Sequence, residues 1–257
     1  MIRIAELLMF CATALCFGVQ AVYFTHMLQL NSYRDERYRR WYGEHTAQVV
    51  NWRRLFPAVL LAVSLFPLDD VWIYGISAGV FLLTALLNWP KKAKKPLVVT
   101  ARVRRLFVTQ TLLLALLFAA SLLLGGWRGL FLLALLSTVV WFWVRIANLL
   151  NQPIEKKIAD GYVRDAAERL EAMPELTVIG ITGSYGKTST KMFLQALLSA
   201  KFNVLMTPES YNTTMGVVRT IREQLKPSHQ IFIAEMGAKN VGDIREICDL
   251  VHPRYGV

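Results

Sequence analysis

The sequence has few of the residues that build disulfide frameworks and metal centres. Its 257 residues include three cysteines and four histidines. Cys11, Cys16 and Cys248 form no pair with the spacing of a disulfide framework or a metal-binding motif. The histidines are scattered along the chain, so we predict no zinc site.

Acidic residues are also scarce. The chain has 18 Asp and Glu against 29 Lys and Arg, which gives a formal net charge of +11. A basic balance is typical of proteins that bind nucleic acid or anionic lipid, and of membrane proteins. Here the basic residues cluster between apolar blocks, and the part after residue 150 carries no nucleic-acid-binding motif. We therefore predict a lipid bilayer, and no nucleic acid, as a partner.

Charged residues are absent from long stretches of the first 150 residues. Residues 7–33 and 106–124 contain no Asp, Glu, Lys or Arg. A helix of about 20 apolar residues crosses a bilayer. The first stretch is too long for a cleaved signal peptide and has only Arg3 before it, so we predict an uncleaved helix. We predict an α-helical membrane domain over residues 1–150, with about five transmembrane helices near 7–30, 55–68, 71–89, 106–124 and 129–150.

The predicted span at 55–68 is shorter than a bilayer normally requires. Asp69 and Asp70 separate it from the next apolar run, at 71–89. This pair of runs forms either two spanning helices, which we favour, or a re-entrant pair. No acidic residue lies in the middle of a predicted span, which argues against a transporter.

The distribution of basic residues predicts the orientation of these helices. Residues 31–54 hold six Arg against three acidic residues, and residues 90–105 hold four Lys and three Arg with no acid. The turns at 69–70 and 125–128 carry almost no basic charge. Under the positive-inside rule, the N-terminus lies outside the bacterial cytoplasmic membrane, and everything after residue 150 lies in the cytoplasm.

Residues 151–175 have the pattern of an amphipathic linker helix. Asn151 is a candidate cap, with Pro153 in the first turn. Apolar residues recur every four positions, at Ile154, Ile158, Tyr162, Ala166 and Leu170. We expect this stripe to dock on the following domain, and a membrane surface is the alternative.

The remaining segment, 176–257, alternates short β-branched runs with helical patterns. Strands are predicted near 176–182, 203–206, 230–236 and 254–257, with helices between them. This alternation predicts an α/β domain with a parallel sheet covered on both faces.

The first of these strands runs into a glycine-rich loop at 183–188, with the sequence G-S-Y-G-K-T. Glycines let backbone N–H groups close around phosphates, and the following helix adds the positive end of its dipole. Lys187 is predicted to contact the β- and γ-phosphates, and Thr188 to bind magnesium. The loop departs from the standard P-loop spacing because Ile181 stands where that pattern has glycine. A short G-K-T segment also occurs by chance as an ordinary turn.

Three segments in register resemble the Mur ligase family. Residues 180–190 (G-I-T-G-S-Y-G-K-T-S-T) resemble its ATP-binding loop, T-G-x-x-G-K-[TS]. Residues 211–217 resemble the family's N-N-x-x-G-V segment, except that Thr213 replaces the second asparagine. Residues 233–238 resemble its E-[LM]-G-A element.

This resemblance implies a set of site residues. It implies that Lys187 and Glu235 are catalytic, and that Thr188 and Glu235 bind magnesium. Asn212 and Thr213 become candidates for a nucleotide or substrate contact, although a helix cap is an equally good interpretation of Asn212. The implied ATP-binding residues are Thr182, Gly183, Ser184, Tyr185, Gly186, Lys187, Thr188 and Ser189.

The resemblance also implies a reaction. ATP, with Mg2+, would phosphorylate a carboxylate of a UDP-linked or lipid-linked cell-wall precursor, and an amino acid or dipeptide would then displace phosphate to form an amide. Alternatives are poly-glutamate synthesis, amidation of a lipid-linked muropeptide, or a non-catalytic ATP-binding membrane scaffold. Because the resemblance covers only residues 176–257, we expect a partial ATP-binding domain and a chain that is incomplete as an enzyme.

Overall fold

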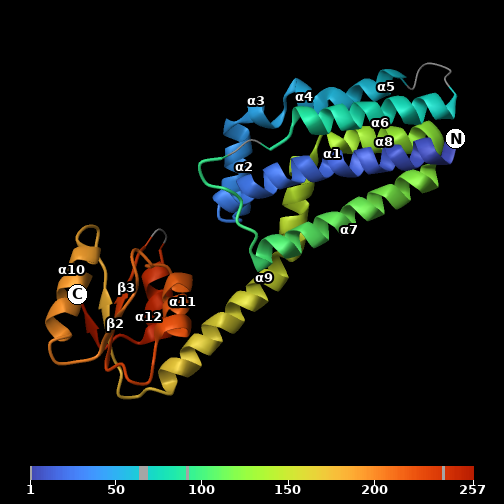
Figure 1. Cartoon of the computed structure of the whole chain (residues 1–257). Coiled ribbons are helices and arrows are strands. Elements are labelled where there is room, and N and C mark those ends of the chain that lie inside the picture. The colour runs from blue at the N-terminus through green and yellow to red at the C-terminus, as the bar shows by residue number, and fades with distance from the viewer. Residues whose placement is uncertain (1, 64–68, 91–92, 239–240) are drawn as a thin grey trace. The chain divides into compact units, whose positions relative to one another are not determined.

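The computed structural model describes residues 2–63, 69–90, 93–238 and 241–257 (Figure 1). The chain divides into two compact units, Met1–Pro153 and Ile154–Val257. The first is helical and the second contains a parallel sheet.

Three long apolar helices dominate the helical unit: α1 (Ile2–Leu30), α6 (Asp70–Leu87) and α7 (Ala101–Leu124). Helices α1 and α6 pack along each other, and Phe24 and Phe81 are fully buried in the core of this unit. Among the described residues, these three helices are long and apolar enough to cross a membrane. Their outer faces remain apolar, as Leu116 and Leu123 of α7 are 67% and 89% exposed. A lipid environment would solvate such faces better than water does.

The segment near 55–68 is not one continuous helix in the described part of the chain. Residues 52–63 form three short pieces: α4 (Trp52–Leu55), the 3-10 turn η1 (Phe56–Ala58) and α5 (Val59–Val63). Pro57 cannot donate a backbone hydrogen bond, which favours the tight turn at this point. Residues 64–68 lie outside the described residues. The remaining short helices before them are α2 (Asp35–Glu44) and α3 (Thr46–Val49).

The predicted span at 129–150 is broken. Helix α8 (Gly126–Ser137) and helix α9 (Val140–Glu171) meet at a bend of 80°, so they count as a fourth candidate span only if the bent pair is taken as one. The hydroxyls of Ser137 and Thr138 donate to the carbonyls of Ala134 and Leu135 at 2.7 and 2.6 Å. Such bonds compete with the helical backbone ladder and account for the break.

The sheet unit confirms the predicted parallel α/β fold. Its strands run in the spatial order β2-β3-β1-β4, with every neighbouring pair parallel. The strands are β1 (Thr177–Ile181), β2 (Val204–Met206), β3 (Ile231–Glu235) and β4 (Tyr255–Gly256). The helices between them are α10 (Lys187–Leu198), α11 (Thr214–Gln224) and α12 (Asp243–Val251).

The two faces of this sheet are covered by different helices. Ile179 and Ile181 pack with Leu194 of α10 on one face. Val178 and Phe232 pack with residues of α11 and α12 on the other (Figure 1). Because β1 lies between β3 and β4, the strand order reverses at β1, and open parallel sheets bind ligands at such a reversal, in the crevice outside the carboxyl ends of the strands.

Helix α9 corrects the predicted start of a linker helix at Asn151. The helix is continuous from Val140 to Glu171 and contains Pro153 in its interior. Asn151 does not act as a cap, because its side-chain oxygen accepts a hydrogen bond from the Thr109 hydroxyl at 3.0 Å.

The C-terminal turns of α9 belong to the sheet unit and pack on it. Ala166 is fully buried there, and Asp165 forms an ion pair with Arg222 of α11. Ile154 and Tyr162, also in the apolar stripe, are 49% and 41% exposed.

Candidate nucleotide-binding site

The glycine-rich loop lies between the end of β1 and the start of α10. Gly183 and Gly186 have φ angles of 141° and 76°, which residues other than glycine rarely adopt. The first backbone bond that closes α10 runs from Thr190 N to Gly186 O at 2.8 Å. The preceding N–H groups have no partner within the helix, so they are available to an anion at the positive end of the dipole.

Most residues of the predicted loop are accessible. Thr182, Ser184 and Ser189 are exposed, and Tyr185 is 95% exposed. The Lys187 ammonium folds back over the loop and donates to the Gly183 carbonyl at 2.5 Å. The loop therefore presents backbone donors and one ammonium group to the crevice.

Glu235 lies at the carboxyl end of β3, at the centre of a group of polar side chains that we call the Glu235 cluster. The cluster consists of Thr188, Lys191, Thr207, Asn212 and Glu235. Glu235 is 1% exposed. Its Oε2 accepts from Lys191 Nζ at 2.9 Å and from the Thr188 hydroxyl at 3.2 Å. Its Oε1 accepts from Asn212 Nδ2 at 3.3 Å, and its backbone N donates to the Thr207 hydroxyl at 3.1 Å.

This cluster keeps Glu235 ionised. Burial raises the pKa of its carboxyl, but the hydrogen bond and charge of Lys191, with hydrogen bonds from Asn212 and Thr188, together place the pKa below its usual value. Lys191 is itself 1% exposed, and its ammonium also donates to the Glu209 carbonyl at 2.5 Å. A buried carboxylate thus has a buried counter-ion on the helix that follows the loop.

The structure separates the roles of Asn212 and Thr213. Thr213 caps α11, since its hydroxyl accepts from Gly216 N at 3.3 Å. Asn212 instead points to Glu235. Its close approach requires Gly237, because a Cβ on that residue would lie 2.7 Å from the Asn212 side chain. Asn212 therefore lies in the crevice, and Thr213 serves the helix.

We expect Thr213→Ala to destabilise α11 by about 1 kcal/mol, because it removes the capping oxygen. Hydrogen exchange of peptides from α11 measures this loss. Thr213→Ser keeps the cap and should exchange like the wild type. An equal acceleration in both variants would contradict the capping role.

Comparison with known proteins agrees with this geometry. Residues 181–257 match the family model described as "Mur ligase middle domain". This segment is therefore similar to the middle domain of Mur ligases.

Proteins similar to this segment include UDP-N-acetylmuramoyl-tripeptide–D-alanyl-D-alanine ligases. The protein from Synechocystis is 40% identical over 82 residues, which cover 32% of this chain and 18% of that protein. The protein from Escherichia coli K12 is 37% identical over 114 residues, which cover 42% of this chain and 25% of that protein. A crystal structure of MurF from Acinetobacter baumannii aligns over 37% of this chain and 21% of that one, with 35% identity and a TM-score of 0.36. The chain thus spans a quarter or less of the length of these relatives.

The loop and the Glu235 cluster provide a donor set that suits magnesium. Magnesium prefers oxygen ligands, keeps several waters, and commonly takes one or two protein carboxylates together with substrate phosphates. The Thr188 hydroxyl and the Glu235 carboxylate already lie 3.2 Å apart beside the loop. The two Glu235 oxygens accept hydrogen bonds from the side chains of Lys191, Thr188 and Asn212, which leaves lone-pair capacity on an ionised carboxylate. These residues therefore fit the ion.

Sequence reasoning missed two members of the Glu235 cluster, Thr207 and the buried Lys191. Lys191 lies four residues after Lys187, one helical turn along α10. A lysine at this spacing is usually solvated. Its burial becomes evident only in the structure, where its ammonium contacts the Glu235 carboxylate and the Glu209 carbonyl. The sequence signal that could have identified Lys191 is the presence of a second lysine after the loop together with a single acidic residue, Glu235, at the end of a predicted strand.

Proposed function

We propose that this chain provides the ATP-binding part of a membrane-bound ATP-dependent amide ligase of the Mur type, which acts on a peptidoglycan precursor. The observation that carries this proposal is the position of the phosphate loop beside the Glu235 cluster, at the reversal of strand order. The loop supplies backbone donors and Lys187, while the cluster supplies an ionised carboxylate where nucleotide-bound magnesium would lie.

The chemistry assigned to these residues is mainly positioning and charge neutralisation. The loop amides and Lys187 hold the β- and γ-phosphates while a substrate carboxylate oxygen attacks the γ-phosphorus and ADP leaves. Thr188 and Glu235 would hold magnesium, which neutralises charge on the phosphates when bound. The amine then attacks the acyl carbon, an amide forms, and inorganic phosphate leaves with the pair of electrons from the broken C–O bond.

The relatives suggest the substrates. Their names specify UDP-N-acetylmuramoyl-tripeptide and D-alanyl-D-alanine, and we propose the same class for this chain: a muramoyl peptide carboxylate and an amino acid or dipeptide amine. A lipid-linked muropeptide is the variant of this substrate that a membrane location would favour.

The proposal is tested by positional isotope exchange in ATP that carries oxygen-18 in its β–γ bridge. Formation of an acyl phosphate frees the β-phosphate of ADP to rotate, so the label moves out of the bridge when the step reverses. In a ligase that contains this chain, we expect exchange with UDP-N-acetylmuramoyl-tripeptide present and no amine, and no exchange without the peptide. ATP binding without any exchange would instead identify a non-catalytic nucleotide-binding scaffold.

We also propose a membrane location with the sheet unit in the cytoplasm. Support comes from the three apolar helices, the bent pair and the basic segments at 31–54 and 90–105. Alkaline phosphatase fused after residue 150 should be inactive, because this enzyme requires export to the periplasm. Fusion after Asp70, in the turn predicted to lie outside, is the matched control and should be active. Strong activity of the fusion after residue 150 would contradict the orientation.

A further inference from the structure

A cavity lies in the helical unit. Its volume is about 610 Å³, and its walls come from the C-terminal turns of α1, the segment 47–54, the end of α6 and the connection at 93–97. Among the described residues that line it there is no Asp or Glu, whereas Arg53, Arg54 and His26 are present.

Arg54 is the unusual member of this basic cavity. Its side chain is only 7% exposed, and its guanidinium lies over the rings of Tyr23 and Phe24, 4.4 and 4.5 Å from their centroids. Its Nη1 donates a long bond of 3.4 Å to the Val49 carbonyl. Its Nε has no hydrogen-bond partner among the described residues. The Arg54 side chain lines the cavity and its charge is nearly buried, which is costly, so an anionic ligand in the cavity would stabilise that charge.

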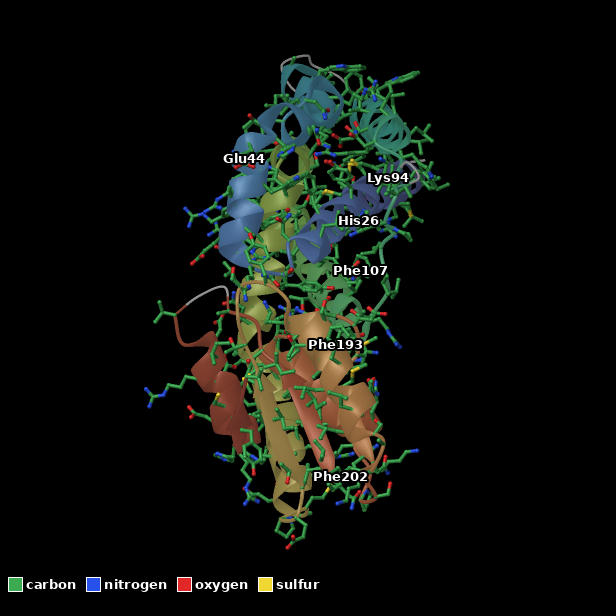
Figure 2. The ribbon with its side chains drawn as sticks, turned by 90° about the vertical axis from the view of Figure 1, so that its left-hand side faces the viewer. His26, Glu44, Lys94, Phe107, Phe193 and Phe202 are labelled. Carbon is green, nitrogen blue, oxygen red and sulfur yellow. The ribbon has the colours of Figure 1, made fainter. Side chains whose placement is uncertain are left out.

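Neighbouring groups shape the same cavity. His26 Nε2 lies 2.7 Å from the Lys95 carbonyl, and because a carbonyl only accepts, this nitrogen carries the proton. This hydrogen bond holds the connection that carries Lys94 and Lys95 against α1 (Figure 2, where His26 and Lys94 are labelled). Asn88 Nδ2 donates to the Arg53 carbonyl at 3.1 Å and fixes the end of α6 beside the segment that carries both arginines.

The other walls are apolar and include Val22, Met27, Leu87, Trp89 and Leu97. Free phosphate would gain nothing from these side chains, whereas an amphiphile would bury hydrocarbon against them. The cavity also lies at the C-terminal ends of α1 and α6, two of the candidate spans, where the headgroups of a bilayer would be.

We propose that the basic cavity binds the phosphate of a lipid headgroup, with Arg54 and Arg53 as the anion-binding residues. Guanidinium groups suit this role because they donate several hydrogen bonds to phosphate oxygens at once. This inference rests on the membrane location proposed above and is independent of the ligase chemistry.

The test uses the full chain in detergent, with native mass spectrometry to count retained lipid. We expect retention of phosphatidylglycerol over phosphatidylcholine in the wild type. Arg53→Gln and Arg54→Gln should each weaken that retention about tenfold, the loss expected for one charge-assisted hydrogen bond. Arg53→Gln is the safer variant for folding, because Arg53 is exposed. Arg40→Gln is the matched control: it removes one charge from the same basic segment, outside the cavity, and should retain lipid like the wild type.

Three results would overturn the proposal. Equal loss in Arg40→Gln would show general charge attraction, and equal retention of both lipids would show no headgroup site. In a third experiment, inorganic phosphate is added to the complex with phosphatidylglycerol. If phosphate displaces the lipid at a concentration equal to that of the added lipid, the cavity is a site for soluble phosphate. Release of the chain from cell membranes by alkaline carbonate would instead contradict the membrane location itself, and with it this inference, while leaving ATP binding untouched.

Discussion

Alanine in place of Lys187 should remove ATP binding without unfolding the chain. Among the described residues, this ammonium donates to the Gly183 carbonyl within its own loop, and that bond ties it to no other helix or strand. With nucleotide bound it would donate to two phosphate groups. At about 1.5–3 kcal/mol for each charge-assisted bond, the loss corresponds to a decrease in affinity of about 100-fold or more. Equilibrium binding of Mg-ATP to the full chain measures it.

The matched control for this substitution is Lys201→Ala, because Lys201 is an exposed lysine just beyond the end of α10. It changes the net charge of the sheet unit by the same amount and should leave affinity within about twofold, as expected for a surface position. If Lys187→Ala binds ATP as the wild type does, or if both variants lose affinity equally, the loop is not the phosphate site.

The sheet and the loop could be predicted because their signals are local. The two central strands, β1 and β3, are short runs rich in β-branched residues, and the glycines of the loop stand between one such run and a helix. Strands β1 and β3 lie close to their predicted positions. Both strands are buried on both faces, so they form continuous apolar runs that are easy to recognise in the sequence.

The parts that failed depend on contacts across the fold. Pro153 predicted a helix start, but Asn151 is engaged by Thr109 of a neighbouring helix, and α9 continues through both residues. The break at Thr138 depends on hydroxyl groups that bond back to the helix, a choice that apolar periodicity does not reveal. Lys191 belongs to the same class, because its burial is decided by a loop eighteen residues away in sequence.

Methionine in place of Lys191 should have the largest effect on stability. Methionine retains the length of the side chain but removes the ammonium that pairs with Glu235 at 2.9 Å, and it leaves that carboxylate 1% exposed without its counter-ion. Removal of one partner of a buried ion pair costs about 3–5 kcal/mol. Because all seven tryptophans precede residue 153, fluorescence reports the helical unit, and hydrogen exchange of peptides from β1 and β3 is the suitable measurement.

Glu235→Gln is the control within the same pair. Combined with Lys191→Met it removes both charges, and the double variant should recover much of the loss because a neutral pair leaves no buried charge uncompensated. A double variant that is as unstable as the sum of the two single variants would show that the two side chains do not act as a pair.

The pH dependence of stability provides a second, independent test of the Lys191→Met prediction. In the wild type the pKa of Glu235 lies below its usual value, so the stability it contributes is present above the unfolded pKa of about 4.3 and is lost as pH falls through the lower folded pKa. Without Lys191, the carboxyl loses the hydrogen bond and the charge that most oppose the effect of burial, so we expect burial to raise its pKa above that of the unfolded chain. The variant then binds a proton more readily when folded, and it loses stability as pH rises. The difference in hydrogen-exchange protection between wild type and Lys191→Met should therefore be largest near neutral pH and should shrink toward pH 4. A difference that stays constant over this range would show that lost packing, and not an unpaired carboxylate, causes the loss of stability.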